Sequence, residues 1–266
     1  MTPQFRTGEQ RRHAESGDVV RIGEQSKHAR GDDVVRIGEQ SKGSGPTLLA
    51  VAHGTRSATG QAEIRGLVAE VARRRPGLDI RLGHVDVQQP RIGDLVTEVR
   101  ATEREAVVVP LLLSTGYHVR VDIAEAVAGT AIRVAPALGP DDVLLDSMTR
   151  HLPPADAVVL AAAGSSDPGW RADIHELATR IPGGAHVGYA AGPQPRVADV
   201  VARLRAGGAR RIAIAAYLLA DGLFYRTLHA AGADSVTPPL CHDPAVADLV
   251  LHRFESALLT SVAGTL

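Results

Sequence analysis

From Thr47 onward, the chain alternates short apolar runs with longer amphipathic stretches. Short apolar runs bounded by glycine, proline or polar residues are typical of buried strands, and apolar positions at a spacing of three and four predict helices. Strands are predicted at 47–53, 79–87, 106–113, 131–134, 155–163, 185–191 and 211–219. Helices are predicted at 58–75, 92–99, from 119 onward, and at 141–150, 173–180, 195–206 and 244–259. Strands separated by helices indicate parallel βαβ units, so the fold class predicted is α/β.

The order of elements occurs twice. The strand at 155–163 runs into Gly164 as the strand at 47–53 runs into Gly54, and the run at 211–219 is the counterpart of 106–113. This internal similarity predicts two similar domains, 47–150 and 151–266, each a parallel β-sheet flanked by helices. We expect a cleft between them.

The first 46 residues have a different character. The segment DVVRIGEQSK occurs at 18–27 and again at 33–42, and a degenerate copy at 6–14 keeps the same period. The repeat unit is polar, so it buries too little apolar surface to offset the entropy of ordering its backbone. We predict a disordered extension over 1–46, which ends in the linker Gly43-Ser44-Gly45-Pro46.

Composition and charge exclude several classes of partner and site. A formal net charge of −1 gives no global attraction to nucleic acid or to an anionic membrane, and neither is expected as a partner. The single cysteine, Cys241, excludes an intramolecular disulfide and a thiolate cluster. The absence of a run of about 20 apolar residues, and of an apolar signal-peptide core, predicts a soluble cytoplasmic protein.

Candidate chemistry lies where the first three predicted strands of the first domain end. His53 follows the first strand, Asp86 lies near the end of the second, and His118 follows the third. In open α/β sheets, ligands bind outside the carboxyl ends of the strands. Imidazole suits iron, cobalt, nickel and zinc, so the three residues predict a metal site. For each histidine alone, the alternative is a loop side chain held in a hydrogen-bond network.

The second half lacks all three polar residues. When Gly54 is placed on Gly164, His53 falls on Ala163, and when Pro90 is placed on Pro195, Asp86 falls on Ala191. In the same way, His118 falls on Phe224. We therefore expect the first half to carry the activity and the second half to be its structural partner.

Three segments resemble the signature segments of the sirohydrochlorin chelatase family, the CbiX/SirB-type class II chelatases. They are AHGTRS at 52–57, HVDVQQP at 84–90 and PLLLSTGYHVRVDI at 110–123. The resemblance extends over 47–266 and includes the degenerate second half of the long, two-domain form. One departure concerns the acid, which is usually glutamate in the family and is the shorter Asp86 here.

The resemblance implies a class II chelatase-like fold and a lyase that inserts a divalent metal into the carboxylate-rich tetrapyrrole sirohydrochlorin. Fe²⁺, which gives sirohaem, is the expected metal. The ion is a substrate of the reaction, and no permanently bound cofactor is implied. His53 and His118 would be metal ligands or proton acceptors, and Asp86 would orient a histidine or act as a further proton acceptor. Enzymes of the same pathway are the other partners implied. The residues expected at the tetrapyrrole are Gly54, Thr55, Arg56, Ser114, Thr115, Gly116, Tyr117 and Arg120.

Several alternatives stay open. The same residues fit a cobaltochelatase of cobalamin synthesis that uses Co²⁺, or a non-catalytic carrier of a tetrapyrrole or metal. Phosphoryl transfer through His53 is less favoured, because families of that kind place arginine directly before the histidine and Ala52 stands here. His84 is a further candidate, since it shares a predicted strand face with Asp86. Further candidates are Arg226 for substrate carboxylates and Cys241-His242 as a ligand pair; the alternative for each is an ordinary surface residue.

Overall fold

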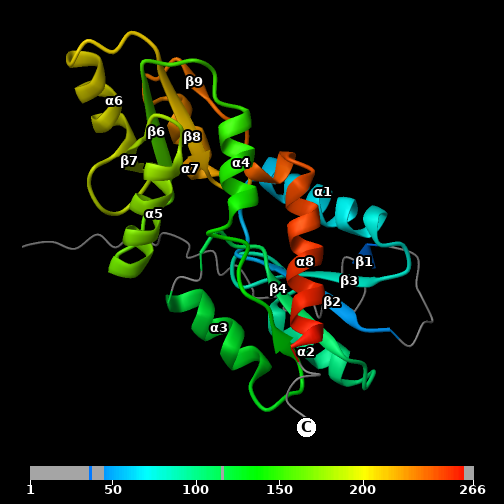
Figure 1. Cartoon of the computed structure of the whole chain (residues 1–266). Coiled ribbons are helices and arrows are strands. Elements are labelled where there is room, and N and C mark those ends of the chain that lie inside the picture. The colour runs from blue at the N-terminus through cyan, green and yellow to red at the C-terminus, as the bar shows by residue number, and fades with distance from the viewer. Residues whose placement is uncertain (1–35, 38–44, 115–116, 261–266) are drawn as a thin grey trace, which may run out of the picture. The chain divides into compact units, whose positions relative to one another are not determined.

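The computed structural model describes residues 36–37, 45–114 and 117–260, with the backbone alone at 36–37 and 117–120. The described residues all belong to one compact unit, Asp33–Leu266, and form two separate β-sheets (Figure 1). None of the described helices is long and apolar enough to span a lipid bilayer.

The first sheet contains five strands in the order β1-β3-β2-β4-β5, all parallel except β1. Its central strand, β2, is buried along its whole length, as expected for a strand covered on both faces. The strands are β1 (Arg36–Ile37), β2 (Thr47–Ala52), β3 (Asp79–His84), β4 (Ala106–Pro110) and β5 (Arg133–Val134). The helices between them are α1 (Ala58–Arg74), α2 (Ile92–Arg100) and α3 (Tyr117–Val127).

The second sheet repeats this arrangement with four parallel strands in the order β7-β6-β8-β9. The predicted α/β class, with two similar parallel sheets flanked by helices, is therefore confirmed. The strands are β6 (Ala157–Ala162), β7 (His186–Tyr189), β8 (Ile212–Tyr217) and β9 (Ser235–Val236). The helices between them are α5 (Pro168–Arg180), α6 (Val197–Ala206) and α7 (Leu223–His229).

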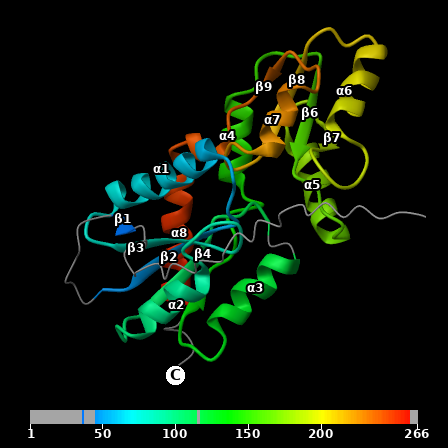
Figure 2. The ribbon, with the colours of Figure 1, turned by 180° about the vertical axis from the view of Figure 1, so that it is seen from behind.

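Each sheet lies between two layers of helices. In the first sheet, Leu49 and Val51 point to a core shared with α2 and α3, while Leu48 and Ala50 point to the opposite core with α1. Seen from behind, α2 and α3 cover one face of this sheet (Figure 2). In the second sheet, α6 and α7 cover one face, and α5 covers the other. Because successive side chains of a strand point to opposite faces, each sheet has an apolar core on both of its faces.

Two helices pack on the sheet of the other half. Helix α4 (Asp142–Arg150) follows the first sheet in sequence but packs against β8, and α8 (Ala245–Leu259), at the end of the chain, packs against β4 and α1. Arg253 on α8 donates to the carbonyl of Ala137 (3.1 Å) and to the carboxylate of Asp141 (2.8 Å), which ties the helix to the first half. The boundary at 150/151 remains a prediction, but the packing of the two halves is interdependent across it.

Some predicted boundaries differ from the structure. The second strand ends at His84 rather than Val87, because Val87 has a φ of 67° that turns the chain away from the sheet. Helix α7, strand β9 and the short 3₁₀ helix η1 (Leu240–His242) were not indicated by the sequence.

The prediction of a disordered extension over 1–46 lies mostly outside the described residues. The disorder of this segment stays a prediction, although its residues Arg36–Ile37 form β1, which pairs antiparallel with Ile80 and Arg81 of β3. The reason is that β3 would otherwise present an unpaired edge, and the apolar part of the repeat can add a strand there.

Removal of residues 1–45 tests how much this edge strand matters. A two-residue ladder adds about two hydrogen bonds, each worth about 1 kcal/mol, so a chain that begins at Pro46 should lose at most about 4–8 °C in melting temperature. Thermal unfolding followed by circular dichroism measures the change. A loss of ten degrees or more would show that the extension is part of the core.

Candidate functional site

The β2–α1 loop carries the first candidate residue. His53 follows the buried strand β2 and is exposed to solvent. Gly54, with a φ of +100°, then turns the chain, and Ser57 caps α1 by accepting a hydrogen bond from the N–H of Gly60 (3.2 Å). The loop is thereby fixed at both ends, with the imidazole at the carboxyl end of the strand.

The β3–α2 loop lies directly against this first loop. The N–H of Asp86 donates to the carbonyl of His53 (2.8 Å), and the N–H of Thr55 donates to Oε1 of Gln88 (2.8 Å). A Cβ atom at Gly54 would lie 2.0 Å from the carbonyl oxygen of Asp86, so only glycine permits this approach. Backbone pairing therefore places His53 and Asp86 at the same edge of the sheet, as predicted.

Arg91 is a site residue that the sequence analysis missed. Its guanidinium donates to Oδ1 of Asp86 (2.9 Å) and to the carbonyl of Val85 (2.8 Å). The N–H of Val87, together with Arg91 and the nearby His53, holds the pKa of the Asp86 carboxyl below its usual range. Asp86 is thus an exposed, ionised carboxylate whose side chain Arg91 orients. In the sequence, the one hint of this role is that Arg91 directly follows Pro90, close to Asp86.

His84 does not share the surroundings of Asp86. It is the last residue of β3 and only 4% exposed, on the face that packs under α1, whereas the Asp86 side chain is 62% exposed beyond the end of the strand. Burial lowers the pKa of His84, and the charges of Arg65 and Arg91 lower it further, which keeps the ring neutral. The expectation that His84 and Asp86 lie on one strand face is therefore wrong, because the strand ends between them.

The third candidate segment is described only in part. Ser114 is half-buried in the β4–α3 loop, whereas Thr115 and Gly116 lie outside the described residues. Tyr117, His118 and Arg120 lie in the first turn of α3, where the structure describes the backbone alone. Because β2 pairs with β3 on one side and β4 on the other, His53, Asp86 and His118 follow three neighbouring parallel strands. The role of His118 remains a prediction.

The second half has the same backbone arrangement without the candidate side chains. The N–H of Ala191 donates to the carbonyl of Ala163 (2.9 Å), and a Cβ at Gly164, with a φ of +107°, would lie 2.1 Å from the carbonyl oxygen of Ala191. These contacts confirm the correspondence of Gly54 with Gly164 and of Asp86 with Ala191. The paired loops belong to the duplicated fold, and His53 and Asp86 are what distinguishes the first half.

The second half contributes to the first half's loop through Asp221. Its Oδ1 accepts from Ser57 Oγ (2.8 Å) and from Arg226 (2.8 Å), and Arg226 also donates to Ser57 Oγ (2.9 Å). Burial opposes ionisation of Asp221, but the bonds from Arg226 and Ser57 outweigh it and hold the pKa of this carboxyl below its usual value. At Gly60, a Cβ would lie 2.0 Å from the carbonyl of Asp221. Arg226 is therefore a paired residue that supports the start of α1 rather than an isolated surface charge.

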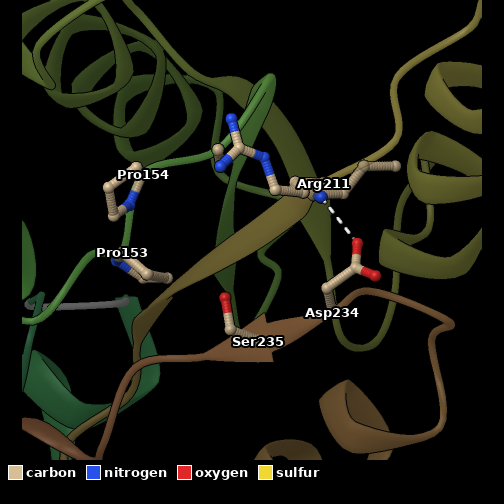
Figure 3. Close-up of a pocket in the computed structure, with 7 residues that line it drawn as sticks. Pro153, Pro154, Arg211, Asp234 and Ser235 are labelled. Carbon is tan, nitrogen blue, oxygen red and sulfur yellow. Dashed lines mark hydrogen bonds between the residues drawn. The ribbon is translucent and has the colours of Figure 1, made fainter.

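Two other features lie away from these loops. A pocket of about 260 Å³ opens beside the amino ends of β6, β8 and β9, but its acid, Asp234, is already bound by the N–H of Ile212 (2.7 Å; Figure 3). Cys241 and His242 approach Glu63 of α1. Burial and the charge of Glu63 raise the pKa of the Cys241 thiol to about 12, so this thiol is not a nucleophile at neutral pH.

Substitution of Arg91 by glutamine tests the assigned electrostatics. Because Arg91 stabilises the ionised carboxylate, Arg91→Gln should raise the pKa of Asp86 toward the ordinary value for aspartate. An NMR titration of the metal-free protein, with Asp86→Asn to assign the signal, measures the shift. An unchanged Asp86 pKa in Arg91→Gln would show that the pairing is absent in solution.

Comparison with known proteins shows which family this chain belongs to. The CbiX family model matches residues 47–154 and 157–257, which together cover most of the chain. No curated protein sequence matches this chain.

Similar solved structures include SirB from Bacillus subtilis with Fe³⁺, with a TM-score of 0.67 at 22% identity over 83% of this chain and 98% of that one. The sirohydrochlorin chelatase SirB from Bacillus subtilis subspecies spizizenii, in complex with cobalt, has a TM-score of 0.66 at 21% identity, with the same shares of both chains. DR2241 from Deinococcus radiodurans, a multi-domain protein similar to chelatases, has a TM-score of 0.56 at 19% identity over 80% of this chain and 55% of that one. These likenesses confirm the class II chelatase-like fold, and from the family match across both halves the chain belongs to the CbiX family.

Proposed function

We propose that this protein is a sirohydrochlorin chelatase, which inserts a divalent metal into that tetrapyrrole, with Fe²⁺ as the metal and sirohaem as the product. The observation that carries the proposal is the pairing of the His53 and Asp86 loops in the first half, set against the same loops with alanines in the second. In a duplicated fold with one active half and one supporting half, the polar site residues are expected in one half only.

The chemistry requires that two pyrrole N–H protons leave while the metal exchanges its water ligands for ring nitrogens. The exposed imidazole of His53 can bind the metal or accept a proton when neutral. Asp86, ionised and oriented by Arg91, supplies negative charge beside it. We assign His118, which follows the neighbouring strand, as the second imidazole of the site.

The carboxylates of the substrate need cationic partners, and arginine binds carboxylates in a bidentate manner. Arg56 is exposed in the same loop as His53, and we assign it to this role together with Arg120. The small residues Gly54 and Thr55 let a flat macrocycle approach the backbone. We also assign Ser114, Thr115, Gly116 and Tyr117, which follow the neighbouring strand β4 in sequence, to the tetrapyrrole.

Cobalt insertion is the second candidate, because one similar structure is a SirB in complex with cobalt. Imidazole and carboxylate ligands discriminate weakly among first-row divalent metals, so the residues fit both ions. An anaerobic absorbance assay with sirohydrochlorin and Fe²⁺ or Co²⁺ in parallel separates the two. Tetrapyrrole binding without turnover with either metal would instead identify a carrier.

Removal of either imidazole should separate binding from chemistry. We expect His53→Ala and His118→Ala each to lower the rate of metal insertion at least about 100-fold, a typical contribution of a proton acceptor. Binding of sirohydrochlorin, measured by its absorbance shift, should stay within a few-fold of wild type because the carboxylates and ring face supply most of the affinity. Wild-type insertion rates in His53→Ala would contradict the assignment of the active half.

The two equivalent glycines provide a matched pair of variants. Gly54→Ala and Gly164→Ala both force a Cβ against a backbone carbonyl at positive φ, so each should lower the free energy of unfolding by about 2–4 kcal/mol. At a temperature where both remain folded, only Gly54→Ala should also lose metal insertion. Equal loss of activity in Gly164→Ala would show that the second half takes part in the chemistry.

A further inference from the structure

A second group of metal-competent side chains lies between α1 and η1. Glu63 comes from α1, and Cys241 and His242 come from η1; one ligand atom of each lies within 4.8 Å of the other two. His242 Nε2 is 2.8 Å from Oε1 of Glu63, and Cys241 Sγ is 4.0 Å from Oε2 of the same carboxylate. None of the three belongs to the loops that carry His53 and Asp86.

The fold holds these groups in place. The N–H groups of Leu240 and Cys241 donate to the carbonyls of Leu218 (3.0 Å) and Leu219 (2.9 Å), which fixes η1 to the end of β8. The N–H of Asp221 donates to Oε2 of Glu63 (2.5 Å), so the carboxylate is oriented from outside the group. The Glu63 side chain is only 15% exposed. A bound cation would therefore find ligands whose backbones and orientation are largely set, with little ordering required.

The donor atoms indicate the class of ion. One sulfur, one imidazole nitrogen and one carboxylate oxygen suit a borderline cation such as Zn²⁺ or Co²⁺, whereas Ca²⁺ and Mg²⁺ prefer oxygen ligands throughout. Tetrahedral zinc ligands at about 2.0–2.3 Å from the ion lie roughly 3.5 Å from one another. One ligand atom of each residue lies within 4.8 Å of the other two, so side-chain rotation must bring the three donors to about that separation. Three protein ligands leave the fourth position for water.

We propose that Glu63, Cys241 and His242 bind a borderline divalent cation, with Zn²⁺ as the best fit, and that this ion joins α1 of the first half to η1 of the second. On binding, a bond forms between the ion and the Cys241 sulfur, and the thiol proton passes to solvent. The charge of the ion offsets the burial and the Glu63 charge that raise the pKa of the free thiol. The ion adds to the Asp221 contacts that already hold the second half against the start of α1. This site does not depend on the proposed chelatase function.

The single cysteine makes the proposal directly testable. Under anaerobic, reducing conditions and without tetrapyrrole, the full chain is titrated with Co²⁺ and followed in the near ultraviolet, where thiolate-to-cobalt charge transfer absorbs. Any such band reports Cys241. We expect a saturable band in wild type and in His53→Ala, loss of the band in Cys241→Ser, and its displacement by Zn²⁺. Glu63→Gln and His242→Gln should each weaken Co²⁺ binding at least about tenfold, since even indirect partners of metal ligands have effects of that size.

A second measurement guards against loss of fold in the variants. Because an ion that binds only the folded chain stabilises it, and the proposed chelatase site would bind Zn²⁺ too, this test uses the His53→Ala background. Zn²⁺ should raise the melting temperature of His53→Ala but not of His53→Ala/Cys241→Ser, and the two metal-free melting temperatures should match. Absence of the charge-transfer band at saturating Co²⁺ would overturn the proposal and leave Glu63 and His242 as an ordinary hydrogen-bonded pair. A band that is unchanged in both Glu63→Gln and His242→Gln would also overturn it, because the thiol would then bind cobalt alone.

Discussion

The contact on which the site depends is the approach of Gly54 to the carbonyl oxygen of Asp86. A side chain at residue 54 would have to occupy the space of that oxygen, so the two loops can pair through their backbones only because a glycine with positive φ is present. The pairing places an imidazole and a carboxylate at one sheet edge without either being buried. Neither therefore incurs the desolvation that would accompany a buried charge. The two side chains remain accessible to a ligand while hydrogen bonds hold their backbone in place.

The same contact at Gly164 and Ala191 shows that this geometry does not require the polar side chains of the first half. The second half retains the loop pairing and the sheet but presents only alanines there. Its contribution is mechanical, because Asp221 and Arg226 hold the cap of α1 and α8 completes the core of the first sheet. In return, α4 of the first half packs against β8 of the second sheet. An apolar core shared between the two halves means that stability in either half affects the loop that carries His53.

Much of the fold was predictable because burial on two faces leaves a clear pattern. Strands such as β2 and β4 read as continuous apolar runs, and their helices carry apolar residues at helical spacing. The residues that differ between the halves could be identified by aligning the two halves on their shared glycines and prolines. The partners of α4 and α8 could not, since periodicity identifies a buried face but not the sheet that covers it. Helix α7 was missed because it has only 7 residues and a single fully buried apolar side chain, Leu228, too few for a helical period to show.

At the site, the sequence allowed a prediction of which residues carry chemistry but not of how they are held. His84 was grouped with Asp86 because a strand period was extended past the turn at Val87. Arg91 was missed because its contact with Asp86 exists only when the loop closes on itself. Both errors arise from loop geometry, which depends on tertiary contacts and has no simple sequence period.

The central claim is that one of two equivalent loop pairs binds the metal. Crystals of the full chain grown with Co²⁺ and measured at the cobalt absorption edge locate each bound ion by anomalous scattering. We predict a strong peak beside His53 and Asp86, and none at the equivalent position beside Ala163 and Ala191. A comparable peak at the alanine loops, or an empty His53 loop at saturating Co²⁺, would contradict the account.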